Sequence, residues 1–470
     1  METQLVVIGG GPGGYAAAFM AADLGLSVTL VDQEPRLGGV CLLRGCIPSK
    51  ALLHVAKVMA EAQHLEDWGV RFARPSVALE TMRARKEKVI ATLSGGLAQL
   101  SKKRNVQVLH ARAVFEDAHT LRLEGNSPAA SGERLRFEQC IIASGSSPAR
   151  ISGLDLASPL VMDSSGALDL PEVPESLLVI GGGYIGLEMG TVYAALGSRV
   201  TVVEMTDGLL PGADRDLVRP LHKRLERQFA AIHLNTRVVS LAEKKGQVEV
   251  AFAGEGAPRT QRFRRVLVAV GRKPNSAGLG LENAGIAVDA RGFIAVDRQQ
   301  RTRQPHIFAI GDIAGEPMLA HKAAHEGKVA AEVAAGEPAE FAPRAVPAVV
   351  FTDPEIAWAG VTETDAARTG RKIETAVFPW GASGRAQAAG RTEGFTKWII
   401  DPDSQRVIGC GIVGPGAGDL VSEAVLAIEM GAHVEDLCHT IHPHPTLSET
   451  LAFAAEVFLG TATDIYRPRA

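Results

Sequence analysis

Two cysteines five residues apart lie in a segment that could perform thiol chemistry. Cys41 and Cys46 stand in the run Gly-Gly-Val-Cys-Leu-Leu-Arg-Gly-Cys-Ile-Pro-Ser-Lys, which covers residues 38–50. Pro48 suits the first turn of a helix, so the pattern predicts a helix that begins close to Cys46. A helix N-terminus and a nearby cation, here Lys50, both favour the thiolate form of a cysteine. The segment therefore predicts a redox-active pair.

Two other interpretations of the pair are buried structural cysteines and a metal site. The chain has 5 cysteines in 470 residues, too few for a disulfide scaffold. The other three, Cys140, Cys410 and Cys438, are scattered among apolar residues. No second close pair completes a set of four thiolate ligands, so we expect no metal.

A glycine motif near the N-terminus predicts one dinucleotide site. Gly9, Gly11 and Gly14 have the spacing Gly-x-Gly-x-x-Gly after the apolar run 5–8, and Asp32 comes later at the end of the next apolar run. The first glycine permits a tight turn, the second lets backbone approach a pyrophosphate, and the third lets helix pack on strand. The helix N-terminus faces the phosphates, and the acid accepts hydrogen bonds from ribose hydroxyls.

The same motif recurs in the middle of the chain. The second copy has the same spacing as the first, including the interval between the last glycine and the acid, and consists of Gly181, Gly183, Gly186 and Glu204. Two copies predict two dinucleotides, most simply FAD and a nicotinamide. A carboxylate would repel a 2′-phosphate, and the first basic residue after Glu204 is Arg215, so NAD is favoured over NADP.

The elements that must position these residues fall into three groups. In the first group we expect strands over 5–8, 27–31, 106–116, 121–124 and 140–143, helices over 15–24, 48–62 and 83–103, and a loop over 125–133. Gly95 and Gly96 should interrupt the third of these helices. In the second we expect strands over 177–180, 199–204 and 266–270 and a helix over 186–196, and a further strand over 307–310 and helix over 321–335 follow this group. In the third we expect strands over 348–351, 396–400 and 406–413, and helices over 419–430 and 449–458.

Charge and hydropathy narrow the possible partners and location. The net charge of −4 offers no basic surface for nucleic acid or an anionic membrane. No segment approaches the roughly 20 apolar residues of a membrane span. The N-terminus runs straight into a strand, without the basic region of a targeting peptide, so we expect a cytoplasmic protein.

The cysteine segment resembles the redox motif of the flavin-dependent disulfide oxidoreductases, most closely the dihydrolipoamide dehydrogenase family, over essentially the whole chain. The resemblance implies that Cys41 exchanges with the substrate and that Cys46 contacts the flavin. It places Lys50 near the reactive nitrogen of the flavin, paired with Glu188. Many relatives have an Asn and an apolar residue at Leu43-Arg44. This departure bears only on fine tuning of the redox potential.

Further segments resemble motifs of the same family. The run Phe-Ala-Ile-Gly-Asp ends in Gly311 and Asp312, and the resemblance implies that Asp312 reaches the ribityl chain of FAD. Further expected cofactor contacts are Ser144, Gly145, Gly271 and Ala320. His321, next to Ala320, is expected to have a positional role.

Two histidines near the C-terminus lie among prolines, at positions 442 and 444. The resemblance assigns His444 as catalytic base and Glu449 as the acid that orients it. This assignment suits the need to take a proton from a thiol near neutral pH, with a carboxylate fixing the tautomer. His442 is expected to be structural.

The expected fold class is α/β, with two Rossmann-like dinucleotide-binding domains and a C-terminal α+β dimerisation domain. The expected divisions are 1–148 and 271–345 for the two parts of the FAD-binding domain, 149–270 for the NAD-binding domain and 346–470 for the dimerisation domain. The expected partners are a second copy of the chain, NAD, and a lipoylated acyltransferase of a 2-oxoacid dehydrogenase complex or a lipoyl carrier protein.

The nearest alternative is another NAD(P)H-dependent flavin disulfide reductase. Enzymes resembling glutathione reductase prefer NADPH, which Glu204 disfavours. Those resembling mercuric reductase carry an extra cysteine pair at the C-terminus, and the tail 463–470 has none. Transhydrogenases of this fold lack the cysteine pair. A role only as a bound structural subunit would not require Cys41, Cys46, His444 and Glu449.

Overall fold

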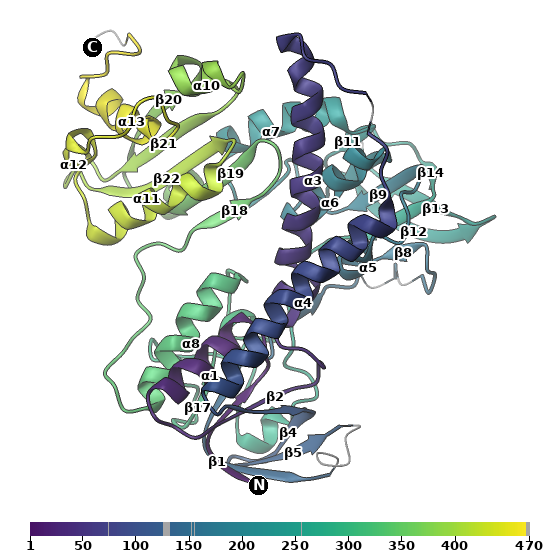
Figure 1. Ribbon diagram of the computed structural model, residues 1–470, viewed down its shortest axis with the longest axis vertical. Helices are drawn as coiled ribbons and strands as arrows, with labels where there is room; N and C mark the ends of the chain where they lie inside the picture. Colours follow the sequence, from purple (N-terminus) through teal and green to yellow (C-terminus); the bar gives the residue numbers. More distant parts are fainter. Residues whose placement is uncertain (74, 126–131, 152, 155, 255, 467–470) are drawn as a thin grey trace.

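The computed structural model describes the chain except residues 74, 126–131, 152, 155, 255 and 467–470. Figure 1 shows two sheet-containing units along the long axis and a C-terminal unit beside the upper one. The predicted fold class is confirmed, because two doubly wound units are followed by an antiparallel sheet with helices. Most of the loop predicted over 125–133 lies outside the described residues.

The first sheet has the order β3-β2-β1-β6-β5-β4, and β17 pairs with β6. Its strands are β1 (Glu2–Ile8), β2 (Val28–Asp32), β3 (Gln107–His110), β4 (Arg112–Asp117), β5 (Thr120–Glu124), β6 (Arg134–Ile142) and β17 (Ile307–Ala309). Because β1, β2, β6 and β17 are parallel, their carboxyl ends share one edge, where such sheets bind ligands. α1 (Pro12–Asp23) and α8 (Ala320–Ala334) pack closely together on this sheet.

The strand predicted over 106–116 is divided in the structure. The N–H of Ala111 donates to the carbonyl of Asp32 at 2.9 Å and closes the parallel pairing of β2 with β3. The chain then enters β4, which pairs antiparallel with β5. The predicted antiparallel pair is therefore present, but the residues before it extend the parallel sheet instead. An apolar run cannot reveal such a change of partner.

The interruption predicted at Gly95 and Gly96 is wrong. Helix α4 (Leu79–Lys103) is continuous, and a Cβ at either glycine would meet nothing within 4 Å. A helical glycine costs about 1 kcal/mol relative to alanine, and tertiary contacts of the helix outweigh this. Lys86 donates to Leu168 O at 2.7 Å and Ser94 donates to Leu37 O at 2.8 Å, so the helix is held along its length.

The second unit repeats the first with a five-stranded sheet of order β11-β10-β9-β15-β8. Its elements are β8 (Val161–Met162), α5 (Ser164–Asp169), β9 (Ser176–Ile180), α6 (Tyr184–Leu196), β10 (Arg199–Val203), α7 (Arg215–Gln228), β11 (Ala231–His233) and β15 (Arg265–Val268). An antiparallel sheet of β12 (Arg237–Lys244), β13 (Gln247–Ala253) and β14 (Thr260–Phe263) covers it. The two units are joined by the ribbon of β7 (Ser146–Pro148) and β16 (Arg272–Pro274).

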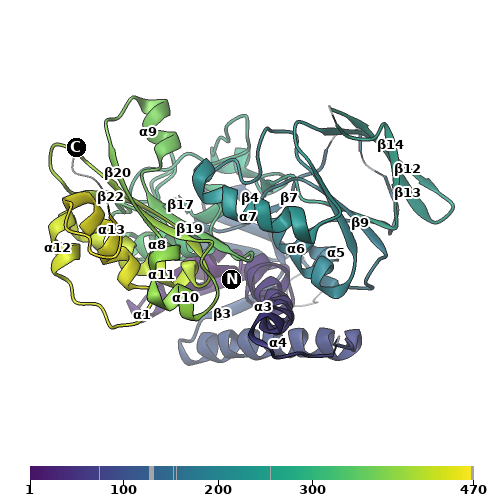
Figure 2. The same ribbon diagram turned by 90° about the horizontal axis from the view of Figure 1, so that it is seen from above.

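The third unit is an antiparallel sheet of order β18-β19-β22-β21-β20, seen from above in Figure 2. Its strands are β18 (Ala348–Val350), β19 (Glu355–Gly360), β20 (Glu374–Pro379), β21 (Phe395–Ile400) and β22 (Val407–Gly414). Its helices are α9 (Glu363–Thr369), α10 (Gly384–Ala388), α11 (Ala417–Met430), α12 (Val434–His439) and α13 (Glu449–Leu459). Trp380 and Trp398 are fully buried in its core, which confirms the predicted α+β character.

One helical stretch, Gly39–Trp68, is long and apolar enough by composition to cross a membrane, which the sequence did not lead us to expect. This is weak support for a span, because core helices meet the same criteria. The stretch comprises α2 (Gly39–Arg44), α3 (Cys46–His64) and the short helix η1 (Leu65–Trp68). Leu52 and Leu53 of α3 pack in the core of the second unit, so one face of α3 is buried against that unit.

Candidate active site

A cavity of about 790 Å³ opens at the carboxyl edge of the first sheet, between the first and second units. This volume is typical of ligand and cofactor sites. Of the predicted residues, those that line the cavity are Gly9, Gly11, Asp32, Cys41, Cys46, Lys50, Ser144, Gly145, Glu188, Gly311, Asp312 and Ala320. The lining does not include Gly14, Gly181, Gly183, Gly186, Glu204, Gly271, His444 or Glu449.

The first glycine loop has the geometry that a phosphate-binding turn requires. Gly9 has φ +108°, and a Cβ there would lie 2.3 Å from Ala143 O. A Cβ at Gly14 would lie 1.8 Å from Gly9 O, so helix and strand could not pack as they do. Gly11 borders the cavity and precedes α1, whose N-terminus has no side-chain cap. The free N–H groups of such a helix end suit a phosphate.

The acid after each glycine loop binds its own loop in the same way. Asp32 accepts from the N–H of Gly10 and, at 2.8 Å, from that of Glu34. Glu204 accepts from the N–H of Gly182 at 2.6 Å and from that of Thr206 at 2.8 Å. Burial raises the pKa of Asp32 even though both backbone groups oppose this. The two loops are therefore built as repeats.

The second glycine loop repeats the steric requirements of the first. Gly181 also has φ +108°, and a Cβ there would lie 2.4 Å from Ala269 O. A Cβ at Gly186 would lie 2.3 Å from Gly181 O. A Cβ at Gly183, by contrast, would have no described atom within 4 Å. Helix α6 begins beyond Gly183 without a side-chain cap. Two uncapped helix ends behind two glycine loops fit the pyrophosphates of two dinucleotides.

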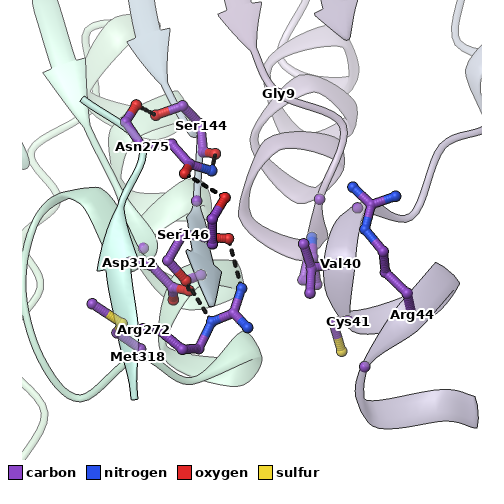
Figure 3. A pocket seen from close by; sticks show the side chains of 18 of the residues that line it. Gly9, Val40, Cys41, Arg44, Ser144, Ser146, Arg272, Asn275, Asp312 and Met318 are labelled. Carbon is purple, nitrogen blue, oxygen red and sulfur yellow. Dashed lines mark hydrogen bonds between the residues drawn. The ribbon is translucent and has the colours of Figure 1, made fainter. Parts of the chain in front are cut away.

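The cysteine pair lies where two helices meet. Cys41 is in α2 and Cys46 is the first residue of α3, and both are free thiols. A Cβ at Gly45 between the helices would lie 2.8 Å from Val40 O, so glycine permits the sharp join. Figure 3 shows Cys41 beside the glycine loop on one wall of the cavity.

The surroundings of the pair favour the thiolate at Cys46. The hydrogen bond from Cys41 lowers the pKa of Cys46 to about 7, and the Lys50 ammonium also lowers it. The same hydrogen bond and burial raise the pKa of Cys41. Cys46 is therefore the better leaving group, and Cys41 is the thiol that stays protonated more readily.

The structure brings Lys50 and Glu188 together across the two units. Lys50 Nζ lies 2.9 Å and 3.1 Å from the two carboxylate oxygens of Glu188. Glu188 is 2% exposed, so its negative charge requires this partner. The ion pair connects α3, which begins with Cys46, to α6 behind the second glycine loop.

The opposite wall contains polar residues that the sequence did not reveal. Arg272 donates to Ser146 Oγ at 2.7 Å and to Ser146 O at 2.6 Å, and Ser146 donates to Asp312 (Figure 3). Asn275 donates to Ser144 O at 2.9 Å. Arg272 directly follows Gly271, which was predicted to contact a cofactor. The sequence signal that could have identified Arg272 was therefore its position next to this glycine.

The turn that presents Asp312 is supported from α8. Gly311 has φ +71°, and its N–H donates to Glu326 at 2.7 Å. Glu326 also pairs with Lys322 at 2.8 Å, and both side chains are buried. Ala320 begins α8 at the cavity, and the next residue, His321, contacts Pro347 O at 2.8 Å.

The two C-terminal histidines have different surroundings. His444 Nδ1 lies 2.8 Å from Glu449, which accepts the N–H of Thr446 with its other oxygen at 2.7 Å. The side chain of His444 is 77% exposed, and the dyad does not border the cavity. His442 lies 2.7 Å from Glu423 and is nearly buried.

Three carboxylates outside the cavity lie within 4.8 Å of one another, namely those of Asp214, Asp216 and Glu363. Lys397 Nζ lies 3.0 Å, 2.9 Å and 2.5 Å from them. The lysine ammonium thus takes the position that a metal ion would need. This cluster joins α7 to the C-terminal sheet.

Comparison with known proteins gives consistent matches over the chain. Residues 3–327 match the family model of the pyridine nucleotide-disulphide oxidoreductases, and residues 346–455 match the dimerisation domain of these proteins. The chain is 50% identical to dihydrolipoyl dehydrogenase of Haemophilus influenzae, with 100% of this chain and 98% of the relative covered. It is 48% identical to that of Vibrio parahaemolyticus, with the same coverage.

Solved structures with the same architecture are also similar. The crystal structure of LpdA from Mycobacterium tuberculosis has a TM-score of 0.88 and 29% identity, covering 97% of this chain and 99% of that one. A HOCl-induced flavoprotein disulfide reductase from Escherichia coli has a TM-score of 0.84 and 29% identity, covering 95% and 98%.

Proposed function

The chain belongs to the pyridine nucleotide-disulphide oxidoreductase family, and we propose that it is a dihydrolipoyl dehydrogenase whose reaction depends on Cys41, Cys46 and His444. The observation that supports this most is the position of the cysteine pair. It borders the cavity at the first glycine loop and lies beside the Lys50–Glu188 pair from the second unit. Thiol chemistry and two dinucleotide sites therefore meet at one place.

The first half of the reaction is thiol–disulfide exchange. In the oxidised enzyme Cys41 and Cys46 form a disulfide, and His444 takes a proton from one thiol of dihydrolipoamide. The substrate thiolate attacks the sulfur of Cys41, and Cys46 leaves as a thiolate. The second substrate thiol then attacks the substrate sulfur bonded to Cys41, and its proton passes to the departing Cys41. This gives lipoamide disulfide, a Cys41 thiol and a Cys46 thiolate, with the first proton held on His444. The low pKa of Cys46 suits its role as leaving group.

The second half moves the electron pair to NAD. FAD, when bound, would supply two-electron transfer between the reduced cysteine pair and NAD. Gly9, Gly11, Asp32 and Asp312 would hold FAD. Gly181, Gly183, Gly186, Glu204 and Gly271 would hold NAD. Ser144, Gly145, Gly311 and Ala320 would shape the flavin site, and Gly14 would pack its helix. Lys50 and Glu188 would lie at the flavin edge.

The remaining assignments follow from this function. The chain acts as a homodimer through residues 346–470, with a lipoylated acyltransferase or lipoyl carrier protein as its substrate partner in the cytoplasm. Its divisions at 148/149, 270/271 and 345/346 stay predictions. Leu43-Arg44 is one departure from the family motif, and Arg44 pairs with Glu34 at 2.5 Å.

The test compares disulfide substrates on the purified holoenzyme. We expect NAD reduction by dihydrolipoamide to exceed reduction of glutathione disulfide by at least about 100-fold in kcat/KM. The reason is that the cations close to Cys41, Lys50 and Arg44, are already paired with Glu188 and Glu34 and are not free to bind glutathione carboxylates. Comparable values for the two substrates would instead favour another disulfide reductase.

A further inference from the structure

Phe351 contacts both members of the ion pair beside Cys46. Its backbone N–H donates to Glu188 Oε1 at 3.1 Å. Its ring centroid lies 4.4 Å from Lys50 Nζ, within the range of a cation–π interaction. Phe351 thus fixes the carboxylate with its main chain and the ammonium with its side chain.

Phe351 reaches this pair from the third unit of the molecule. It directly follows β18, the edge strand that pairs with β19 in the C-terminal sheet. Figure 1 shows this sheet beside α3. Lys50 comes from α3 and Glu188 from α6. Phe351 is not part of the cavity lining, so its effect on the reacting groups must pass through Lys50.

The position of the Lys50 ammonium matters because that side chain has freedom to move. Its side chain is 33% exposed, whereas that of Glu188 is 3% exposed. A lysine stem that left the ring would place its charge in solvent and leave Glu188 facing Cys46. The positive charge favours the Cys46 thiolate and the negative charge disfavours it, so their balance depends on where the ammonium is held.

We propose that Phe351 is a positioning residue of the redox site, which holds Lys50 against Glu188 through its ring and its backbone N–H. This inference rests on the proposed function, because it takes Cys46 as the thiolate that faces the flavin. The electrostatic surroundings of Cys46 are otherwise fixed by its own helix and its neighbours. The titratable groups that act on Cys46 or respond to it are Cys41, Lys50, Glu188, Tyr15 and Tyr184.

The experiment titrates Cys46 directly in the holoenzyme. In a Cys41→Ser background no disulfide forms, so the long-wavelength absorption between the Cys46 thiolate and oxidised FAD follows the ionisation of one thiol. Adding Phe351→Leu removes the ring and keeps the backbone N–H. We expect the midpoint of the absorption to rise by roughly half a pH unit, since the ring no longer holds the ammonium. Adding Phe351→Tyr should leave the midpoint unchanged.

A second series separates ring electrostatics from packing. Phenylalanine analogues with increasing fluorination at position 351 keep the ring shape and weaken its negative face, so the midpoint should rise progressively. The control is Phe293→Leu, whose ring faces Arg291 at 4.9 Å outside the cavity lining, and which should not move the midpoint.

The outcomes separate this inference from the function on which it rests. A rising midpoint in the fluorinated series, with Tyr at the parent value, supports the positioning role. If the Leu variant and the fluorinated series had the same midpoint as the Cys41→Ser parent, the positioning role of Phe351 would be overturned, while the proposed function would stand. A Cys41→Ser parent without pH-dependent long-wavelength absorption would remove the assignment of Cys46, and with it the inference.

Discussion

His444 Nδ1 lies 2.8 Å from Glu449 Oε1, yet the side chain of His444 is 77% exposed and lies outside the cavity that Cys46 borders. Glu449 is fixed by the N–H of Thr446 at 2.7 Å, so the carboxylate orients the imidazole ring. A single chain therefore has an ordered imidazole base that faces solvent and a thiol site whose described lining contains no histidine. A homodimer in which each chain supplies its base to the other satisfies both features.

Loss of the base should be more severe than loss of its orienting acid. His444→Gln should lower kcat for dihydrolipoamide oxidation by about 10²- to 10⁴-fold, the usual value of general-base catalysis. Glu449→Gln should lower it less, because the base remains. His442→Gln should mainly lower Tm, since His442 is nearly buried against Glu423. Equal losses of kcat in all three variants would contradict these roles.

Cys46→Ser should abolish lipoamide turnover while the protein keeps its bound FAD. The flavin site that we propose is built by the first glycine loop, Asp32 and Asp312, none of which needs the thiol. The measurement is steady-state turnover together with the flavin absorbance of the purified protein. Cys438→Ser, at a half-buried cysteine outside the cavity, is the control and should keep near-normal turnover. Substantial turnover in Cys46→Ser would refute the assignment.

NAD should be used much better than NADP. Glu204 already accepts N–H groups from Gly182 and Thr206, so its carboxylate is held at the loop where a 2′-phosphate would approach. Both groups are negative, so their contact is unfavourable. Replacing Glu204 with Arg should reduce the preference, and kcat/KM for both coenzymes measures it. An equal kcat/KM in the wild-type enzyme would show that Glu204 does not discriminate.

The buried charge cluster around Lys397 should make stability depend on pH. Burial raises the pKa of Asp214, but the N–H of Thr364 and the Lys397 ammonium outweigh this and hold that pKa below its ordinary value. The stability that Asp214 contributes is therefore present above its unfolded pKa and is lost as pH falls through the lower folded pKa. Lys397→Met leaves the buried carboxylate of Asp214 without its cation, which should cost about 3–5 kcal/mol near neutral pH.

The pH dependence should weaken in the variant. Without the ammonium the pKa of Asp214 should rise, since Lys397 no longer opposes the effect of burial, so the loss of Tm in Lys397→Met should shrink between pH 7 and pH 4.5. The control is Lys57→Met, whose partly exposed pair with Glu355 at 3.5 Å should contribute at most about 1 kcal/mol. A Tm deficit that stays constant with pH would contradict the account.

The parts of the fold and site that could be predicted were those defined by local spacing. The glycine loops and the Cys41–Cys46 segment contain their geometry within a few residues, and the structure shows why other residues would clash at Gly9 and Gly14. The split at Ala111 and the continuous helix through Gly95 depend on partners distant in sequence, which a local pattern does not specify.

The polar wall of the cavity shows the same limit. Arg272 and Ser146 are 126 residues apart, and only the β7–β16 ribbon brings them together next to Asp312. Phe351 reaches Lys50 from another unit and has no motif around it. The resemblance to a family could suggest Glu188 as the partner of Lys50, but the contacts that support the pair required the three-dimensional arrangement.

Complementation between two inactive variants tests the central claim most directly. In a homodimer with shared sites, each site takes cysteines from one chain and the base from the other. A heterodimer of a Cys46→Ser chain and a His444→Gln chain then contains one site without either substitution. We expect lipoamide turnover to reappear on verified subunit exchange, at up to half of the wild-type rate per dimer. If His444 acted within its own chain, every site would carry one lesion, and the absence of recovered turnover would contradict the shared site.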